Sequence, residues 1–308
     1  MDVETLLTEL YVIVDDFCKS LPPEPLRRGP QPALTRSEVV TLLLFSQWTP
    51  FESERAFYRY ASHHLRPLFP RLPRRSQFNR QARAASGTVI AFSHELAQWC
   101  GAEQEAFQVV DTMGCAVRNH QRRGCGWLAG LTTIGRCNRL GWYEGFNILT
   151  CVSPLGVITG FGIAPANTKE QPFTADFLAA RAVGHPQLPE VGRPIPGYYL
   201  ADTGFEGADA HTDWFQRFGV RFITPPKRRQ ALQPWPRPLR RWHAGLRQIV
   251  ETVHNKLLNT FRLEDERPHE WQGFRVRLSA KVCLHNFFIW LNLQLGRPPL
   301  AFADLVKW

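Results

Sequence analysis

The sequence is poor in several features that mark particular classes of protein. It has only 2 Met and no run of 18 apolar residues, so we expect no membrane span. Its 7 Cys are odd in number and form no C-x-x-C pair, which argues against a disulfide framework and the usual zinc modules. The opening MDVETLLTEL is acidic at its start, unlike a signal peptide. We therefore expect a reduced, cytoplasmic protein.

Acidic residues are missing from two long stretches of a chain whose formal net charge is +10. From Arg55 to Arg83 there are 8 arginines, and from Arg221 to Arg247 there are 8 basic residues, with no Asp or Glu in either stretch. Arginine outnumbers lysine by 31 to 6, and its planar guanidinium suits phosphate well. Two basic stretches on a basic chain indicate a polyanion binder, with nucleic acid as the expected partner. A solvated basic surface is the alternative.

Residues 1–100 are expected to form an all-helical domain. Apolar residues recur at helical spacing in four segments: 3–21, 34–48, 52–65 and 72–100. Thr35 and Glu38 have capping-box spacing, and Ser76 is expected to cap the basic fourth segment. Short helices with a basic one after PRR resemble a helix-turn-helix module. Its DNA contacts would come from the first turns of that helix, at Arg74, Arg75, Asn79 and Arg80. The alternative is a helical cap packed on another domain.

Residues 101–308 have the pattern of a second, α/β domain. Strand-like apolar runs occupy five segments: 106–113, 142–154, 156–165, 197–205 and 220–226. Helical patterns occupy four others: 174–184, 208–219, 242–263 and 278–295. This order predicts a mixed five-stranded sheet flanked by helices.

Three acidic residues stand where such a fold would bring them together. The first strand is expected to end at Asp111 and the fourth at Asp202, and functional residues gather at strand ends in open α/β sheets. Glu251 lies on a later helix, one turn after Arg247 and one turn before His254. Neighbouring carboxylates favour a Mg²⁺ site. Alternatively, the two Asp residues shape turns and Glu251 makes a surface ion pair. Four further acids are rivals: Glu144, Asp176, Glu206 and Glu264.

The segments VVDTMG, LADTGFEG and RQIVETVHNKL resemble the three acidic motifs of DDE transposases from bacterial insertion sequences. The resemblance covers essentially the whole chain and implies an RNase H-like catalytic domain after an N-terminal DNA-binding domain. It implies that Asp111, Asp202 and Glu251 hold two Mg²⁺ ions, for which Mn²⁺ can substitute. The expected activity is cleavage at element ends followed by strand transfer into target DNA, in the bacterial cytoplasm at the nucleoid.

The third motif differs from that of related branches of the transposase family, which have Tyr-x-x-Arg-x-x-x-Glu and a Lys seven positions after the Glu. Arg247 and Glu251 match, but Ala244 and Leu258 stand at the Tyr and Lys positions, so His254 or Lys256 would take the place of that lysine. The expected DNA contacts of this domain are Lys227, Arg228, Arg229, Arg247, His254 and Lys256.

Three aromatic residues are candidates for stacking on a displaced base: Trp142, Tyr143 and Trp235. Pairing two DNA ends requires at least a homodimer on DNA. Two other functions stay open, a DNA-binding protein that no longer cuts and a metal-dependent nuclease without strand transfer.

Overall fold

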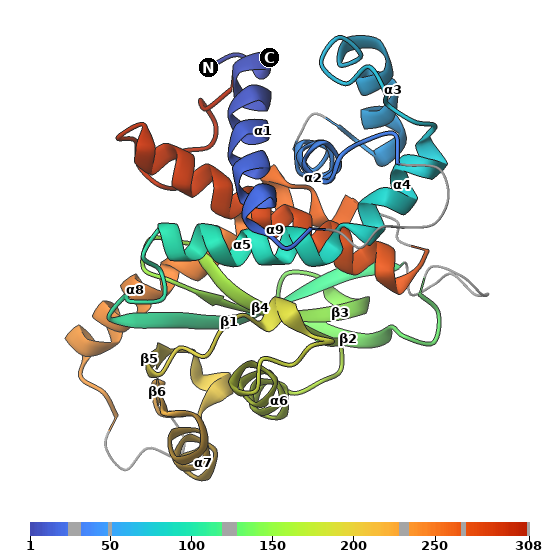
Figure 1. Cartoon of the computed structure of the whole chain (residues 1–308). Coiled ribbons are helices and arrows are strands. Elements are labelled where there is room, and N and C mark those ends of the chain that lie inside the picture. The colour runs from blue at the N-terminus through green and yellow to red at the C-terminus, as the bar shows by residue number, and fades with distance from the viewer. Residues whose placement is uncertain (24–31, 49–50, 119–127, 228–233, 266–268, 307–308) are drawn as a thin grey trace.

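The computed structural model describes residues 1–23, 32–48, 51–118, 128–227, 234–265 and 269–306 (Figure 1). Two layers of helices enclose one sheet, and a group of N-terminal helices stands above them. No helix in these ranges is long and apolar enough to cross a membrane.

Five helices form the N-terminal part of the described chain, and three of them begin after a residue whose side chain caps the helix. They are α1 (Val3–Ser20), α2 (Arg36–Phe45), α3 (Glu54–His64), α4 (Arg75–Ala84) and α5 (Ser86–Trp99). The capping box of α2 is present as predicted, because Thr35 and Glu38 each accept a hydrogen bond from the other's backbone N–H. The predicted cap at Ser76 is wrong. Arg74 is extended after Pro73, so α4 begins at Arg75 and its cap position makes no side-chain hydrogen bond.

A mixed sheet forms the centre of the molecule, as predicted. Its strands are β1 (Phe107–Arg118), β2 (Thr133–Cys137), β3 (Gly141–Val152), β4 (Ile158–Pro165), β5 (Gly197–Leu200) and β6 (Val220–Ile223). β3 pairs antiparallel with β1 on one side, and with both β2 and β4 on the other. β5 continues the sheet parallel to β1, and β6 lies parallel to β5. The five predicted strands are all present, and β2 is a sixth that the sequence pattern did not indicate.

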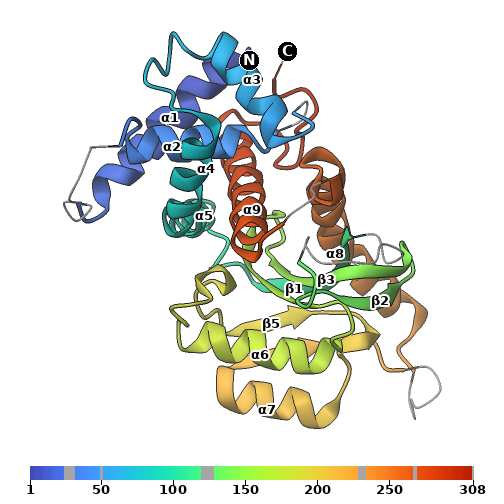
Figure 2. The ribbon, with the colours of Figure 1, turned by 90° about the vertical axis from the view of Figure 1, so that its right-hand side faces the viewer.

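Helices cover both faces of this sheet. Figures 1 and 2 show α6 (Glu170–Ala182) and α7 (Ala208–Phe218) below it and α9 (Trp271–Gln294) above it, with α5 beside α9. Successive residues of a strand point to opposite faces, so Val110 packs with α6 and α7 while Val109 and Met113 pack in the cluster on the other face. Asp111 shares the parity of Val109 and Met113, which directs its side chain toward the upper face.

α9 joins the N-terminal helices to the sheet. It is buried along nearly its whole length and contacts α2, α5 and β4. Asn286 exchanges two hydrogen bonds with the backbone of Ile158, at 3.0 and 2.9 Å, and its amide also donates to Ser93 Oγ on α5 at 3.2 Å. One hydrophobic cluster consequently runs from Leu6 to Val306 through both parts of the chain.

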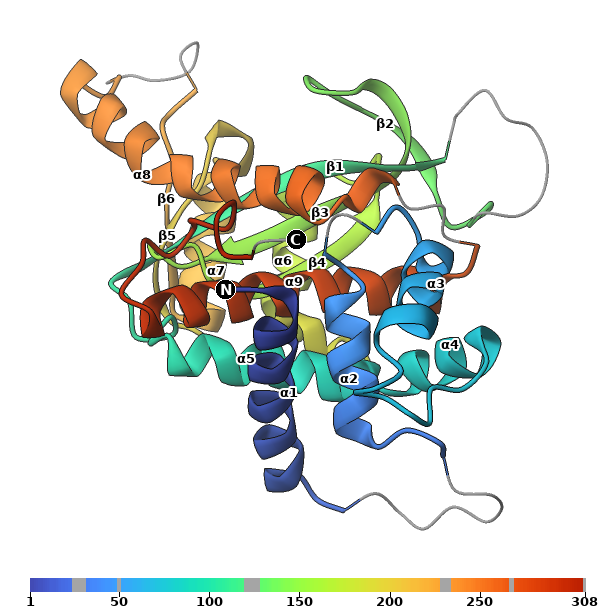
Figure 3. The ribbon, with the colours of Figure 1, turned by 90° about the horizontal axis from the view of Figure 1, so that it is seen from above.

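α8 (Arg237–Asn255) lies across β1 and β3 on the upper face (Figure 3). A single π-helical turn, Lys256–Thr260, extends it, and a short 3₁₀ turn, Leu263–Asp265, follows. Only four residues of α8 are buried: His243, Val250, Val253 and His254. The first half therefore projects beyond the sheet, and the second half carries the contacts that fix the helix.

Candidate active site

Asp111 and Asp202 lie at equivalent positions on neighbouring strands. Val109 of β1 pairs with Leu200 of β5, so each aspartate is two residues beyond this last pair. The expectation that the two strands are neighbours is thereby confirmed. The expectation that β1 ends at Asp111 is wrong, because pairing with β3 carries β1 on to Arg118 after β5 has stopped. Asp111 is thus held within a ladder on one side and has no strand partner on the other.

Burial dominates the electrostatics of Asp111. It raises the pKa of the carboxyl from 3.8 to about 7, the Arg247 guanidinium works in the opposite direction, and the nearby Asp202 raises it further. Arg247 Nη2 lies 3.3 Å from Asp111 Oδ2, and the backbone N–H of Thr112 donates to Oδ1 at 2.9 Å. Without a further cation, this carboxylate is only weakly stabilised in its charged form.

Asp202 both shapes a turn and contributes to the site. It caps the 3₁₀ turn Thr203–Phe205, and its Oδ1 accepts a hydrogen bond from Gly204 N at 2.7 Å. The turn-forming role considered from the sequence is therefore real. It also fixes the carboxylate near Asp111, close enough to influence the pKa of that group.

Glu170 is a third carboxylate of this site that the sequence reasoning missed. It is the first residue of α6, and its Oε1 accepts a hydrogen bond from Thr112 Oγ1 at 2.7 Å. Burial raises the pKa of Glu170, and Asp202 raises it further. A methyl group on Gly204 would overlap Glu170 Oε2. The only local signal is an acid in the first turn of a helix, since the contact itself spans 58 residues.

Three contacts fix α8 over the sheet. His243 Nε2 lies 3.1 Å from Ile223 O at the end of β6, Arg247 pairs with Asp111, and His254 Nε2 lies 2.7 Å from Thr150 Oγ1 on β3. Spacings of four and seven residues put these three side chains on one helix face. Thr150 is the cross-strand partner of Asp111, so the contacts of Arg247 and His254 are made to neighbouring residues of β1 and β3.

Glu251 lies on α8 between Arg247 and His254. It is four residues after Arg247 and three before His254, which puts it roughly 60° around the helix from His254, at the edge of the face turned to the sheet. Glu251 is exposed, and the described chain contains no ion pair between it and Arg247. In the described ranges, no three Asp, Glu, His or Cys side chains are already close enough to hold a metal ion.

His254 is not placed to contact DNA. The side chain is buried against β3, and burial, together with the charges of Arg139 and Arg247, lowers the pKa of its imidazole to about 3. A neutral, buried imidazole cannot bind a DNA phosphate. The predicted DNA contact of His254 is therefore corrected to a structural role, in which the ring fixes α8 on β3. No local pattern indicates this contact, because the partner Thr150 is 104 residues away.

The other predicted DNA-binding residues are distributed over two regions. Arg74, Arg75 and Arg80 are exposed at the start of α4, whereas Asn79 donates to Glu54 Oε2 at 2.5 Å. Lys227 is exposed and lies 3.8 Å from Glu206, while Lys256 Nζ lies 5.1 Å from the centre of the Phe302 ring. Arg228 and Arg229 lie outside the described residues.

The three aromatic candidates differ in exposure. Tyr143 is buried, and Trp235 is half-buried with its ring edge-on to His243. Trp142 is 62% exposed. Only Trp142 of the three therefore presents most of its surface to solvent.

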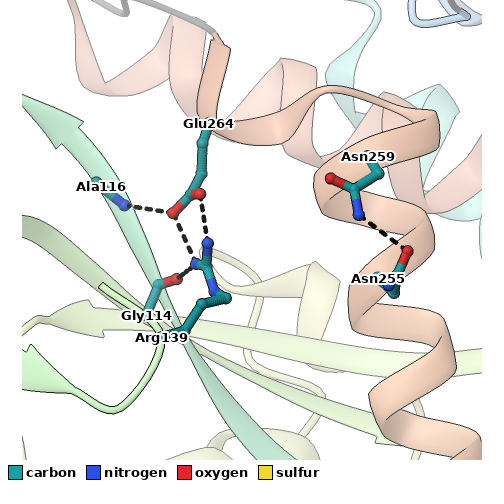
Figure 4. A network of polar contacts seen from close by, with 6 residues as sticks. All are labelled: Gly114, Ala116, Arg139, Asn255, Asn259 and Glu264. Atoms are coloured by element: carbon teal, nitrogen blue, oxygen red, sulfur yellow. Dashed lines mark hydrogen bonds and ion pairs between the residues drawn. The ribbon is translucent and has the colours of Figure 1, made fainter. Parts of the chain in front are cut away.

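The rival acids are engaged elsewhere or lie apart. Glu264 accepts from Ala116 N at 3.1 Å and from both terminal nitrogens of Arg139 at 2.6 and 2.7 Å, and Arg139 also donates to Gly114 O (Figure 4). This network ties the segment after α8 to β1 and to the β2–β3 turn. Glu144 accepts from Thr132, and Asp176 is exposed on α6.

Comparison with known proteins places this arrangement in a family. A cryo-EM structure of the piggyBac transposase synaptic complex with hairpin DNA superposes with a TM-score of 0.50 at 8% identity, covering 96% of this chain and 74% of that one. This likeness supports the RNase H-like fold class. A Mos1 transposase paired-end complex with left transposon end covers 83% of this chain and 87% of that one at 11% identity, but its TM-score of 0.24 carries no weight.

The family match rests on the sequence. No curated protein matches the chain significantly. Residues 117–287, more than half of the chain, match the family described as Transposase DDE domain, and this segment includes Asp202, Glu170 and Glu251 but begins after Asp111. The chain therefore belongs to the Transposase DDE domain family.

Proposed function

We propose that this protein is a DNA transposase that cleaves phosphodiester bonds at the ends of a mobile element and joins the freed 3′-OH to target DNA. The observation that carries the proposal is the matched placement of Asp111 on β1 and of Asp202 just after β5, with α8 fixed above them. Two neighbouring carboxylates suit divalent cations, which would stabilise the negative charge that the reaction of a phosphodiester develops on oxygen.

The residues at this site fit divalent cations. Mg²⁺ prefers carboxylate oxygens, and the raised pKa of Asp111 reflects a buried carboxylate that lacks enough positive charge around it. Asp111 and Asp202, with a third acid, would hold two Mg²⁺ ions, with Mn²⁺ as a substitute. Such ions would supply an activated nucleophile and stabilise the charge on the leaving oxygen.

The third acid is assigned to Glu251, with Glu170 as the competing candidate. Glu251 is supported by its place on α8 between the contacts of Arg247 with Asp111 and of His254 with Thr150. Glu170 is supported by its hydrogen bond to Thr112 and its electrostatic coupling to Asp202. The two acids belong to opposite layers of the fold, because α8 crosses the upper face of the sheet (Figure 3) and α6 lies below it (Figure 2). Their removal should therefore have separable effects.

Arg247 has a distinct role in this scheme. Its guanidinium pairs with Asp111, with Nη2 at 3.3 Å from Oδ2. With cations at the carboxylates, this guanidinium would be free to bind a phosphate oxygen of the DNA strand. The exposed arginines at the start of α4 and on the projecting half of α8 would bind the flanking DNA backbone. DNA as the partner agrees with the fold likeness to a transposase solved with hairpin DNA.

The test is cleavage of supercoiled DNA that carries the sequences flanking the gene, in Mg²⁺ or Mn²⁺ and in EDTA. We expect metal-dependent breaks at the element ends, and joined products when target DNA is added. Asp202→Asn should bind DNA as the wild type does and make no breaks. Glu251→Gln should behave in the same way, while Glu170→Gln should retain measurable cleavage.

Three outcomes would change the proposal. Equal cleavage by Asp202→Asn and wild type would refute the site. Breaks without joined products would indicate a nuclease. DNA binding without breaks in any metal would favour a repurposed DNA-binding protein.

A further inference from the structure

The edge of β1 that faces β5 loses its strand partner next to the proposed active site. β5 pairs with β1 from Phe107 to Val109 only, whereas β1 continues to Arg118. None of the described strands pairs with this edge beyond Val109. Asp111 lies two residues past that point, so the part of β1 that carries it is held by a strand on the β3 side alone.

The backbone groups at this free edge are bound by side chains. Backbone N–H and C=O groups of alternate residues point to the same edge of a strand, which puts those of Thr112, Gly114 and Ala116 together. The amides of Thr112 and Ala116 donate to carboxylates, and the carbonyl of Gly114 accepts from a guanidinium. These groups therefore lie on the edge opposite β3, where a strand would otherwise bind them.

Arg139 and Glu264 act as a pair at this edge (Figure 4). Arg139 Nη2 donates to Gly114 O at 2.7 Å, and Glu264 Oε1 accepts from Ala116 N at 3.1 Å. The two side chains also bind each other at 2.6 and 2.7 Å, through both terminal nitrogens and both oxygens. Bidentate, charge-assisted hydrogen bonds of this kind fix the geometry of both partners. The pair therefore supplies a donor and an acceptor at a fixed spacing, as a neighbouring strand would.

Glu264 also connects this edge to α8, the helix that carries Glu251. It lies in the 3₁₀ turn Leu263–Asp265, which follows the π-helical turn Lys256–Thr260 at the end of α8. Phe261, between the two turns, is fully buried. The connection from α8 to Glu264 is thus short and packed in the core, so the bond of Glu264 to β1 also holds the end of α8.

The contact of Glu264 does not use the carboxylates of the proposed cation site. Arg247 holds α8 through the Asp111 carboxylate itself, so that contact competes with cations for the same group. Glu264 instead binds a backbone N–H, that of Ala116, further along β1. This link between α8 and β1 can therefore stay in place when cations bind.

We propose that Arg139 and Glu264 are positioning residues of the active site. By completing the free edge of β1 and holding the end of α8 on it, they keep Asp111 and Glu251 at the spacing that shared cations require. This inference rests on the proposed function, in which the two acids hold the same cations. It adds that two residues which do not themselves bind the cations decide how tightly the cations are held.

The first test measures Mn²⁺ binding without DNA, by electron paramagnetic resonance of the free ion, with Asp111→Asn as the background. Glu264→Ala should weaken Mn²⁺ binding about tenfold, the effect of losing a residue that orients metal ligands. Glu264→Gln should have a smaller effect, because an amide oxygen can still accept from Ala116 N. Asp265→Ala is the matched control, since Asp265 pairs with Arg262 at 2.8 Å instead of binding β1, and it should leave the affinity unchanged.

A second measurement follows amide hydrogen exchange in EDTA, without metal or DNA. Glu264→Ala should speed exchange at Ala116, which loses its acceptor. It should also speed exchange at Thr112, whose N–H donates to Asp111 and not to the substituted side chain. Faster exchange at Ala116 alone would overturn the inference, because the pair would then have no effect on the residue beside Asp111.

Two further variants separate the shape of the pair from its charge. The double variant Arg139→Glu and Glu264→Arg restores an ion pair but puts a donor opposite the N–H of Ala116. It should not restore Mn²⁺ affinity, and a full rescue would overturn the inference. Arg139→Lys covers the case in which Glu264→Ala does not fold. Its ammonium keeps the charge but lacks the planar fork that binds Gly114 O and both Glu264 oxygens, so Mn²⁺ affinity should also fall.

The outcomes distinguish this inference from the proposed function. Unchanged Mn²⁺ affinity in Glu264→Ala and Arg139→Lys would overturn the inference even if the wild type cuts DNA. Weaker Mn²⁺ binding by these variants would support it even if the wild type never cuts. A wild type that binds Mn²⁺ no better than Asp111→Asn would contradict both. With a DNA substrate, Glu264→Ala should slow single-turnover cleavage about tenfold at saturating DNA while DNA affinity stays unchanged.

Discussion

Replacing Asp111 with asparagine should remove a pH dependence of folding stability that the buried carboxyl creates. The folded-state pKa of about 7 lies well above the ordinary 3.8, so the folded protein binds this proton more tightly than the unfolded chain does. Stability from this group is greatest at low pH and is lost as the pH rises toward the folded-state pKa. Asparagine has the same shape and does not titrate.

The magnitude follows from the interval over which the two states differ in protonation. Between pH 5 and pH 8, the unfolded carboxyl is ionised throughout, while the folded one ionises near pH 7. The wild type should therefore lose about 3 kcal/mol more unfolding free energy than Asp111→Asn does over this interval. His254, whose pKa is lowered to about 3 by burial, contributes with the opposite sign, but equally in both proteins. The difference between the two proteins isolates Asp111.

The assay is urea unfolding at pH 5, 6, 7 and 8 in EDTA, for wild type, Asp111→Asn and the exposed control Asp176→Asn. We expect the control to parallel the wild type. If the unfolding free energies of wild type and Asp111→Asn stay parallel from pH 5 to pH 8, the carboxyl is not desolvated as the structure places it. The argument for a cation at this position would then lose its electrostatic basis.

Three other substitutions test separate parts of the structure. Gly204→Ala should displace the Glu170 carboxylate and slow single-turnover DNA cleavage about tenfold, without lowering the melting temperature. Unchanged cleavage would show that the reaction does not depend on the position of Glu170. Arg181→Met should lower the unfolding free energy by about 3 kcal/mol in urea titrations, because the carbonyl oxygens of Thr159 and Arg193 and the Tyr199 hydroxyl would each lose a buried donor. Glu264→Gln should weaken the link to Arg139 by about 1–2 kcal/mol and speed hydrogen exchange of the Ala116 amide; unaltered exchange there would contradict the network.

Features encoded by neighbouring residues could be predicted from the sequence. The capping box of α2 depends on Thr35 and Glu38, three positions apart, and it was found where the pattern placed it. The five apolar runs became strands, and Asp202, the acid at which the fourth strand was expected to end, caps a turn. The missing sixth strand, β2, is short and exposed at alternate residues, so it had little apolar signal.

Features that depend on distant partners could not be predicted. β1 runs past Asp111 only because β3 supplies hydrogen bonds along its whole edge. Glu170 joins the site through Thr112, and His254 is buried through Thr150, in each case across a long stretch of chain. Periodicity and local propensity carry no information about such pairs. The pattern of strands therefore predicted that Asp111 and Asp202 come together, but it did not predict the contacts of Glu170 and His254.

The position of α9 has a consequence for the order in which the chain can fold. α1, α2 and α5 emerge first during synthesis, yet their apolar faces are completed by a helix that begins at Trp271. The amino group of Met1 also donates to Leu305 O at 3.0 Å. Contacts between such distant segments form slowly and leave apolar surface open in the meantime. The nascent chain should therefore depend on chaperones until α9 has left the ribosome.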